Sequence, residues 1–200
     1  MKCKISIVIP AYNEERRIGR TLEEYGSFFE GLKKKKEILD FEILVVLNGC
    51  KDNTIGVVKK FQKKYKEIIF LDFKRGGKGF AITEGFKSAL RRDNGLIGFV
   101  DADLATSPKS FYDLIKKSGN YDGIIASRGM KESKVDTSFS RKLTNRGFNL
   151  VVRMILMLPY RDTQCGAKLF KRRALDYFLS IWELGEWSFD IDLLYKLKKG

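Results

Sequence analysis

Short apolar runs alternate with amphipathic segments along the first 128 residues, and this alternation constrains the fold more than any other feature. The runs lie at 5–9, 41–47, 68–73, 96–100 and 122–128, and most are rich in β-branched or aromatic residues, as buried strands are. The segments between them carry apolar residues at spacings of three and four, which predicts helices. Alternating strands and helices predict an α/β fold with a mostly parallel, twisted sheet and helices on both faces.

The run at 96–100 ends in two carboxylates, Asp101 and Asp103, one residue apart. In extended chain, residues i and i+2 point the same way, so both can face one spot at the carboxyl end of a strand. Open α/β sheets bind ligands at that edge, and paired carboxylates suit Mg²⁺ or Mn²⁺ shared with phosphate oxygens. A merely polar strand exit is the alternative interpretation. Ser107 and Pro108 then predict a helix start, as N-cap and first helical residue.

Two other loops that follow predicted strands carry polar residues. Pro10 ends the first strand, and Asn13 is predicted to cap the next helix, with Glu14 and Glu15 in its first turn. The basic turn 74–79 places Gly-Gly-Lys-Gly before a helix. Such a turn can hold phosphate through backbone N–H groups and a lysine, or can simply be flexible.

The charge and composition of the chain limit which classes of binding partner and which chemistry it can have. Lys and Arg outnumber Asp and Glu by 39 to 25, and the net charge of +14 favours polyanions: nucleic acid, anionic lipid or phosphorylated substrates. Nucleic acid is disfavoured, because the aspartate pair would repel it and no nucleic-acid-binding motif occurs. The chain has no histidine, which excludes histidine acid–base chemistry and histidine metal sites. Three widely spaced cysteines indicate a reducing, cytoplasmic setting.

The second half of the chain is more basic. The stretch 142–156 has one basic and one apolar helical face, which predicts either contact with an anionic membrane surface or packing on the sheet. No apolar run reaches the roughly 20 residues that span a bilayer, so membrane contact is expected to be peripheral. The N-terminus leads directly into a strand and is not expected to be a signal peptide.

Four segments together resemble the inverting family-2 glycosyltransferases of the GT-A fold, and among them the polyprenyl- or dolichyl-phosphate sugar transferases. They are 6–15 (SIVIPAYNEE), 77–79 (GKG), 100–104 (VDADL) and 162–170 (DTQCGAKLF). The resemblance implies one GT-A (Rossmann-like) domain over 1–200. Its nucleotide-sugar-binding half would be 1–128, and its acceptor-side half 129–200. Such relatives continue past the position of Gly200, so the acceptor half is expected to be either short by nature or truncated.

The resemblance also implies roles for individual residues. Those implied to bind the donor are Pro10, Ala11, Tyr12, Asn13 and Glu14 at the nucleoside, Asn48 and Asp52 at the base, Arg75, Lys78 and Gly79 near the diphosphate, Arg128 at the phosphates of donor and acceptor, Asp101 at the ribose or metal, and Ala102 beside it. Asp101 and Asp103 would hold Mg²⁺ or Mn²⁺. Asp103, Asp162 and Asp190 are the candidate catalytic residues. The last two are candidate bases if the acceptor is a hydroxyl. Asp162 is alternatively expected to position the substrate, and the structural alternatives are a turn former for Asp162 and a helix cap for Asp190.

The implied reaction moves a sugar from a nucleotide-sugar to a polyprenyl phosphate at the cytoplasmic face of a membrane. A phosphate acceptor is already anionic and needs no strong base, so the lack of histidine is no obstacle. The mannosyl branch often carries Gln soon after Asp-Ala-Asp-Leu; this chain has Ala105 and Thr106, which favours UDP-glucose over GDP-mannose. Many family members have an acidic residue where this chain has Asn48. Two alternatives remain: transfer to a hydroxyl of a soluble glycan or protein, and a non-catalytic basic module that binds membrane or nucleic acid.

Overall fold

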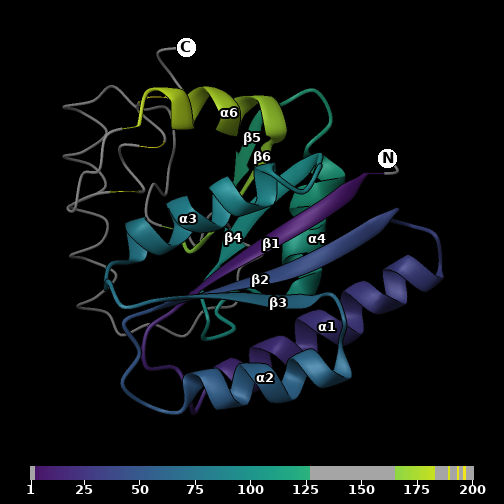
Figure 1. Cartoon of the computed structure of the whole chain (residues 1–200). Helices are drawn as coiled ribbons and strands as arrows, with labels where there is room; N and C mark the ends of the chain where they lie inside the picture. Colours follow the sequence, from purple (N-terminus) through teal and green to yellow (C-terminus); the bar gives the residue numbers. More distant parts are fainter. Residues whose placement is uncertain (1–2, 127–164, 183–188, 190–192, 194–195, 197–200) are drawn as a thin grey trace, which may run out of the picture.

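The computed structural model describes residues 3–126, 165–182, 189, 193 and 196. These residues form a sheet flanked by helices (Figure 1). The elements in chain order are β1 (Lys4–Ala11), α1 (Ile18–Lys34), β2 (Asp40–Asn48), α2 (Thr54–Lys64), β3 (Ile68–Phe73), α3 (Lys78–Leu90), β4 (Leu96–Val100), α4 (Pro108–Lys117), β5 (Gly123–Ile125), β6 (Ala167–Lys171) and α6 (Arg172–Ser180).

The sheet of the described residues has the strand order β3-β2-β1-β4-β6-β5. The strands β1 to β4 pair in parallel, whereas β6 pairs antiparallel with both β4 and β5. The prediction of a mostly parallel sheet is therefore confirmed, and β6 is the reversed strand within it. The strand predicted at 122–128 is described as β5 over Gly123–Ile125 only.

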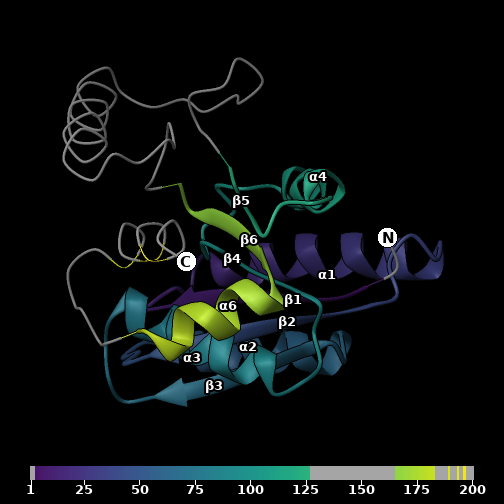
Figure 2. The same ribbon diagram turned by 90° about the horizontal axis from the view of Figure 1, so that it is seen from above.

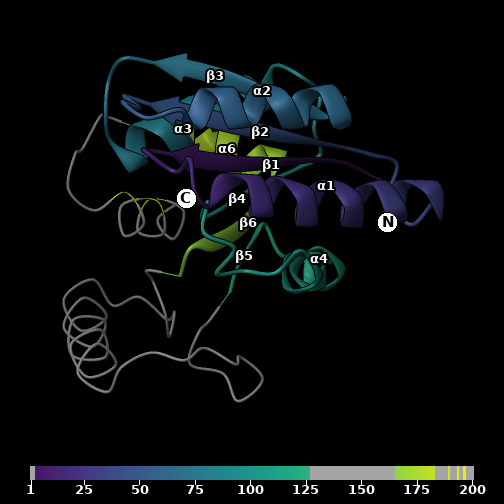
Figure 3. The same ribbon diagram turned by 90° about the horizontal axis from the view of Figure 1, so that it is seen from below.

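Helices cover both faces of the sheet, as the sequence predicts (Figures 2 and 3). Alternation along β1 separates two cores, because successive side chains of a strand point to opposite faces. Ile5, Ile7 and Ile9 pack with apolar residues of α1, α2 and α4. Val8 packs on the opposite face with residues of α3 and α6, including Phe86. The sheet is thus buried on both sides, which fits its nearly continuous apolar strands.

One predicted helix start is confirmed and one is wrong. Ser107 caps α4, its hydroxyl accepting the N–H of Ser110 at 3.2 Å, and Pro108 is the first helical residue. Asn13 does not cap a helix, because α1 begins only at Ile18. Instead Asn13 has a φ of 54°, and its side-chain oxygen accepts the N–H of Lys51, in the loop after β2, at 2.7 Å.

No helix in the part of the chain that the structure describes is long and apolar enough to cross a lipid bilayer.

Candidate functional site

A pocket of about 210 Å³ lies at the carboxyl ends of β1, β2 and β4. It is lined by Pro10, Tyr12, Glu14, Asn48, Lys78, Asp101, Ala102 and Asp103. Every one of these is a site residue predicted from the sequence, and they come from four separate segments: the ends of β1, β2 and β4 with the residues that follow, and the start of α3. The structure therefore brings together residues up to 93 positions apart at the sheet edge where open α/β folds bind ligands.

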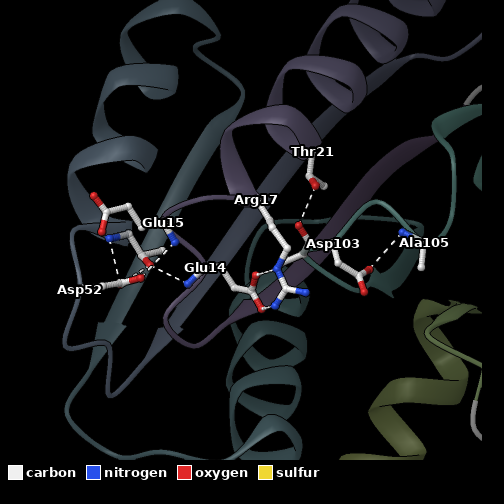
Figure 4. Close-up of polar contacts among 9 residues, drawn as sticks. Glu14, Glu15, Arg17, Thr21, Asp52, Asp103 and Ala105 are labelled. Atoms are coloured by element: carbon white, nitrogen blue, oxygen red, sulfur yellow. Dashed lines mark hydrogen bonds and ion pairs between the residues drawn. The ribbon is translucent and has the colours of Figure 1, made fainter.

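One lysine and three carboxylates line this pocket, and the carboxylate of Glu14 accepts two hydrogen bonds from the guanidinium of Arg17 at 2.7 Å. The ammonium of Lys78, at the start of α3, lies 2.6 Å from Oδ1 of Asp101, directly after β4. The two side chains are 49% and 31% exposed, so solvent screens the pair and its stabilising effect is small. Asp103 turns one oxygen back to its own loop and accepts the N–H of Ala105 at 3.0 Å (Figure 4).

Gly166 lies against the carboxylate of Asp101 and is a site residue that sequence reasoning missed. It directly precedes β6, the strand that pairs with β4. A Cβ placed on Gly166 would be only 1.9 Å from Oδ2 of Asp101, far inside ordinary contact. Only glycine permits this approach, so the chain directly before β6 lies against Asp101. The signal in the sequence was the position of this glycine within the segment 162–170.

The loops after β1 and β2 are joined by hydrogen bonds (Figure 4). The N–H of Glu14 donates to the hydroxyl of Thr54 at 2.8 Å, and the N–H of Glu15 donates to Oδ2 of Asp52 at 3.1 Å. Oδ1 of Asp52 accepts the N–H of Thr54 at 3.1 Å and also its hydroxyl. Asn13 itself has a left-handed backbone and its side-chain oxygen accepts the N–H of Lys51, so it cannot act as the cap of a helix that starts at Glu14.

Asp52 is therefore not brought to the pocket with the other predicted residues. It lines a second, adjacent hollow of about 520 Å³, together with Asn13, Glu15 and Arg17 among others. Burial alone would raise the pKa of its carboxyl, but the hydrogen bonds from Thr54 and Glu15 outweigh burial and lower that pKa. In the structure Asp52 joins two loops, and contact with a base remains a prediction.

Asn48 is buried at the end of β2 and bridges two neighbouring segments. With its amide oriented to satisfy both, the nitrogen donates to the carbonyl of Ala11 at 2.5 Å and the oxygen accepts the N–H of Gly77 at 3.2 Å. A carboxylate here would have no proton for Ala11. The amide that departs from the family pattern is thus the group that fits both partners.

The remaining predicted residues divide into two sets. Ala11 is buried in β1, Gly79 approaches Phe189 closely, and the guanidinium of Arg75 lies 4.9 Å from the ring centroid of Phe80. None of these three lines the pocket. Predictions that lie outside the described residues concern Arg128, Asp162, Asp190 and the amphipathic segment 142–156.

The aspartate pair fits a metal that is shared with a substrate. The described residues contain no group of three or more His, Cys, Asp or Glu side chains that could hold an ion by themselves. Mg²⁺ commonly takes one or two carboxylates and completes its shell with phosphate oxygens and water. Two carboxylates beside a lysine suit a metal–diphosphate, so Asp101 and Asp103 stay the predicted ligands.

Comparison with solved structures identifies the fold. Glucosyl-3-phosphoglycerate synthase from Mycobacterium tuberculosis, solved with Mn²⁺, UDP and phosphoglyceric acid, matches 96% of this chain and 63% of its own at 18% identity, with a TM-score of 0.66. S. aureus TarS 1-349 matches 98% of this chain and 55% of its own at 21% identity, with a TM-score of 0.60. These neighbours are GT-A glycosyltransferases, so the predicted fold is confirmed.

Sequence comparison identifies the family. Dolichyl-phosphate beta-glucosyltransferase ALG5D of Trichomonas vaginalis is 36% identical over 95% of this chain, and the human dolichyl-phosphate beta-glucosyltransferase is 35% identical over 96%. The chain spans about 60% of the length of these relatives. The family model described as Glycosyl transferase family 2 matches residues 6–179. This chain therefore belongs to glycosyl transferase family 2.

Proposed function

We propose that this protein is an inverting glucosyltransferase that moves glucose from UDP-glucose to a polyprenyl phosphate such as dolichyl phosphate. The observation that carries the proposal is the pocket at the carboxyl edge of the sheet. It gathers a tyrosine, an amide, a lysine and two aspartates in a chain that is 36% identical to a dolichyl-phosphate beta-glucosyltransferase. The division into a donor half (1–128) and an acceptor half (129–200) belongs to the same proposal.

The donor is proposed to lie across the pocket. Tyr12 is 53% exposed at the end of β1, and its ring offers a flat surface for uracil. Asp101 and Asp103 would hold Mg²⁺ or Mn²⁺, which when bound supplies positive charge to the diphosphate. Lys78 is the cation among the described residues that line the pocket, and its ammonium can turn from Asp101 towards a phosphate oxygen.

For this reaction the side chains have to orient the two substrates and stabilise the charge of the leaving group. An oxygen of the lipid phosphate attacks the anomeric carbon of glucose, forming a new C–O bond as the bond to the UDP oxygen breaks. The electron pair leaves with UDP, and the α-linked donor gives a β-linked product. Negative charge grows on the leaving diphosphate, so the positive charge of Lys78 is placed to stabilise it. The acceptor is already an anion, so no side chain has to remove a proton.

The lipid acceptor places the reaction at a membrane surface, and we propose a peripheral position at the cytoplasmic face. The net charge of +14 supports attraction to anionic lipid headgroups.

A transfer assay tests the proposal. The purified chain is incubated with radiolabelled UDP-glucose, dolichyl phosphate in detergent, and Mn²⁺, and the label that enters the organic phase is counted. GDP-mannose is the control donor, and a mixture with EDTA is the control for metal. Label in the lipid from UDP-glucose alone, abolished by EDTA, is the expected result.

The other outcomes separate the alternatives. Label on a water-soluble glycan or protein would move the acceptor to a hydroxyl. Thermal shift with UDP, GDP and dTDP, each with and without Mn²⁺, reports the donor site separately, because ligands that bind only the folded state raise Tm. Neither transfer nor a metal-dependent rise in Tm with any nucleotide would refute the enzyme and favour a basic binding module.

A further inference from the structure

Two buried hydroxyls of α1 hold the loop 101–107, which joins β4 to α4. The hydroxyl of Thr21 donates to the carbonyl of Ala102 at 2.7 Å, and the phenol of Tyr25 donates to the carbonyl of Thr106 at 2.9 Å. Both side chains are fully buried, and each lies 81 positions from its partner in the sequence. Figure 4 shows Thr21 above this loop, opposite the turn that contains Asp103.

The spacing and packing of these two residues fix where their hydroxyls lie. Thr21 and Tyr25 are four positions apart, so they share one face of α1. The ring of Tyr25 is stacked on Phe29, with centroids 6.1 Å apart, and lies tilted against Phe111 of α4 at 6.3 Å. Burial raises the pKa of the Tyr25 phenol, so its proton stays available for the bond.

The loop itself needs such support. Leu104 has a φ of 60°, in the left-handed region that residues with a side chain rarely adopt. Such backbone persists only where the surrounding structure over-determines it. Within the loop, one oxygen of Asp103 bonds the N–H of Ala105. Thr21 bonds the carbonyl of Ala102, which lies between the two aspartates in the sequence. Tyr25 bonds the carbonyl of Thr106, which follows the left-handed residue Leu104.

We propose that Thr21 and Tyr25 are positioning residues, whose hydroxyls hold the loop so that Asp101 and Asp103 face the donor before it arrives. The effect on the donor rests on the proposed function, whereas the effect on the loop does not. Groups that are already ordered bind without a further loss of conformational entropy. Loss of either hydroxyl therefore loosens the loop and weakens the binding of a metal–nucleotide, although every side chain that would touch the ligand is unchanged.

Four variants make the test specific. Thr21→Val and Tyr25→Phe each remove one hydroxyl and keep the shape of the side chain. Thr21→Ser restores the hydroxyl and is the rescue. Ser118→Ala is the matched control: its hydroxyl is also buried and also donates to a carbonyl, that of Ile115, at 2.7 Å, but at the far end of α4.

The first measurement is amide hydrogen exchange in the protein without ligand. Peptides that cover 101–107 are expected to exchange about 5- to 10-fold faster in Thr21→Val and Tyr25→Phe, the factor that one net hydrogen bond is worth. Thr21→Ser and Ser118→Ala are expected to match the wild type. Wild-type exchange in both hydroxyl-deletion variants would overturn the proposal.

The second measurement is titration with UDP in the presence of Mn²⁺. Thr21→Val and Tyr25→Phe are expected to bind about 5- to 10-fold more weakly, with Thr21→Ser restored. Faster exchange with unchanged UDP affinity would overturn the positioning role. If the wild type itself does not bind UDP with Mn²⁺, the proposed function fails, and hydrogen exchange alone then decides whether the two hydroxyls hold the loop.

Discussion

Replacing Gly166 with alanine should impair the donor site far more than the fold. The added Cβ would lie 1.9 Å from Oδ2 of Asp101, about 1.5 Å short of an ordinary contact at 3.4 Å. Gly166 is not among the residues with a positive φ, so the backbone itself accepts alanine. The carboxylate is 31% exposed and can swing towards solvent, but it then leaves Lys78 and the position that it takes in the pocket.

The size of the effect follows from that displacement. Moving a group at a reaction centre by about 1 Å can cost about 100-fold in rate, which corresponds to about 2.7 kcal/mol of transition-state stabilisation. We therefore expect kcat/KM for UDP-glucose to fall by about 100-fold in Gly166→Ala. The free energy of unfolding should change by less than about 1 kcal/mol, because a side chain relieves the contact and alanine lowers the entropy of the unfolded chain.

The assay compares initial rates of glucose transfer with urea unfolding curves for the same preparations. Gly31→Ala is the control, because a Cβ there meets nothing within 4 Å and the residue lies on α1, away from the pocket. It should keep wild-type transfer and gain up to about 1 kcal/mol of stability from helix propensity. Wild-type kcat/KM in Gly166→Ala, with an intact fold, would refute the close approach of Gly166 to a functional carboxylate.

Three further predictions concern the charged residues. Asp103→Asn should lower transfer by at least about 100-fold with unchanged circular dichroism; near-normal rates at saturating Mn²⁺ would contradict its role as a ligand. Lys78→Met should raise KM for UDP-glucose about 10-fold and change stability by less than about 1 kcal/mol, since its ion pair is exposed; an unchanged KM would remove the lysine from the diphosphate. The folded-state pKa of Asp52 is lowered, so its contribution to stability is full above about pH 4 and is lost as the pH falls through that pKa. Urea unfolding should show Asp52→Asn less stable than wild type near pH 7, with the gap narrowing as the pH falls below about 4; a pH-independent gap would contradict this.

Elements that depend on residues close together in the sequence were predicted correctly. The strand expected at 68–73 is β3 with the same bounds, and the strand expected at 41–47 extends by one residue at each end. Ser107 caps α4 because a serine before a proline supplies its own acceptor to the next turn. The parallel-sheet rule also gathered the pocket residues, since it places the ends of β1, β2 and β4 at one edge.

Contacts between distant loops could not be predicted. Asn13 has the side chain of a helix cap, but its oxygen is taken by Lys51, which lies 38 positions along the chain. The two hydroxyls of α1 look like ordinary core residues in the sequence. Gly166 is 65 positions from Asp101, and nothing in either segment alone says that the two touch. Sequence patterns predict which face of a helix or strand is buried and where the element ends. The three contacts above depend instead on how the folded elements pack against one another.

The reversed strand β6 has a consequence for how the protein is made. On the ribosome, β4 emerges with β1 already available as a neighbour, but its other edge stays unpaired until residues 167–171 have been synthesised. During that interval β5 has no partner among the described strands, because it pairs only with β6. An unpaired central strand invites pairing with other chains. Pausing of translation within this interval should therefore increase aggregation of the nascent chain, and a fragment that ends before Ala167 should need a chaperone to stay soluble.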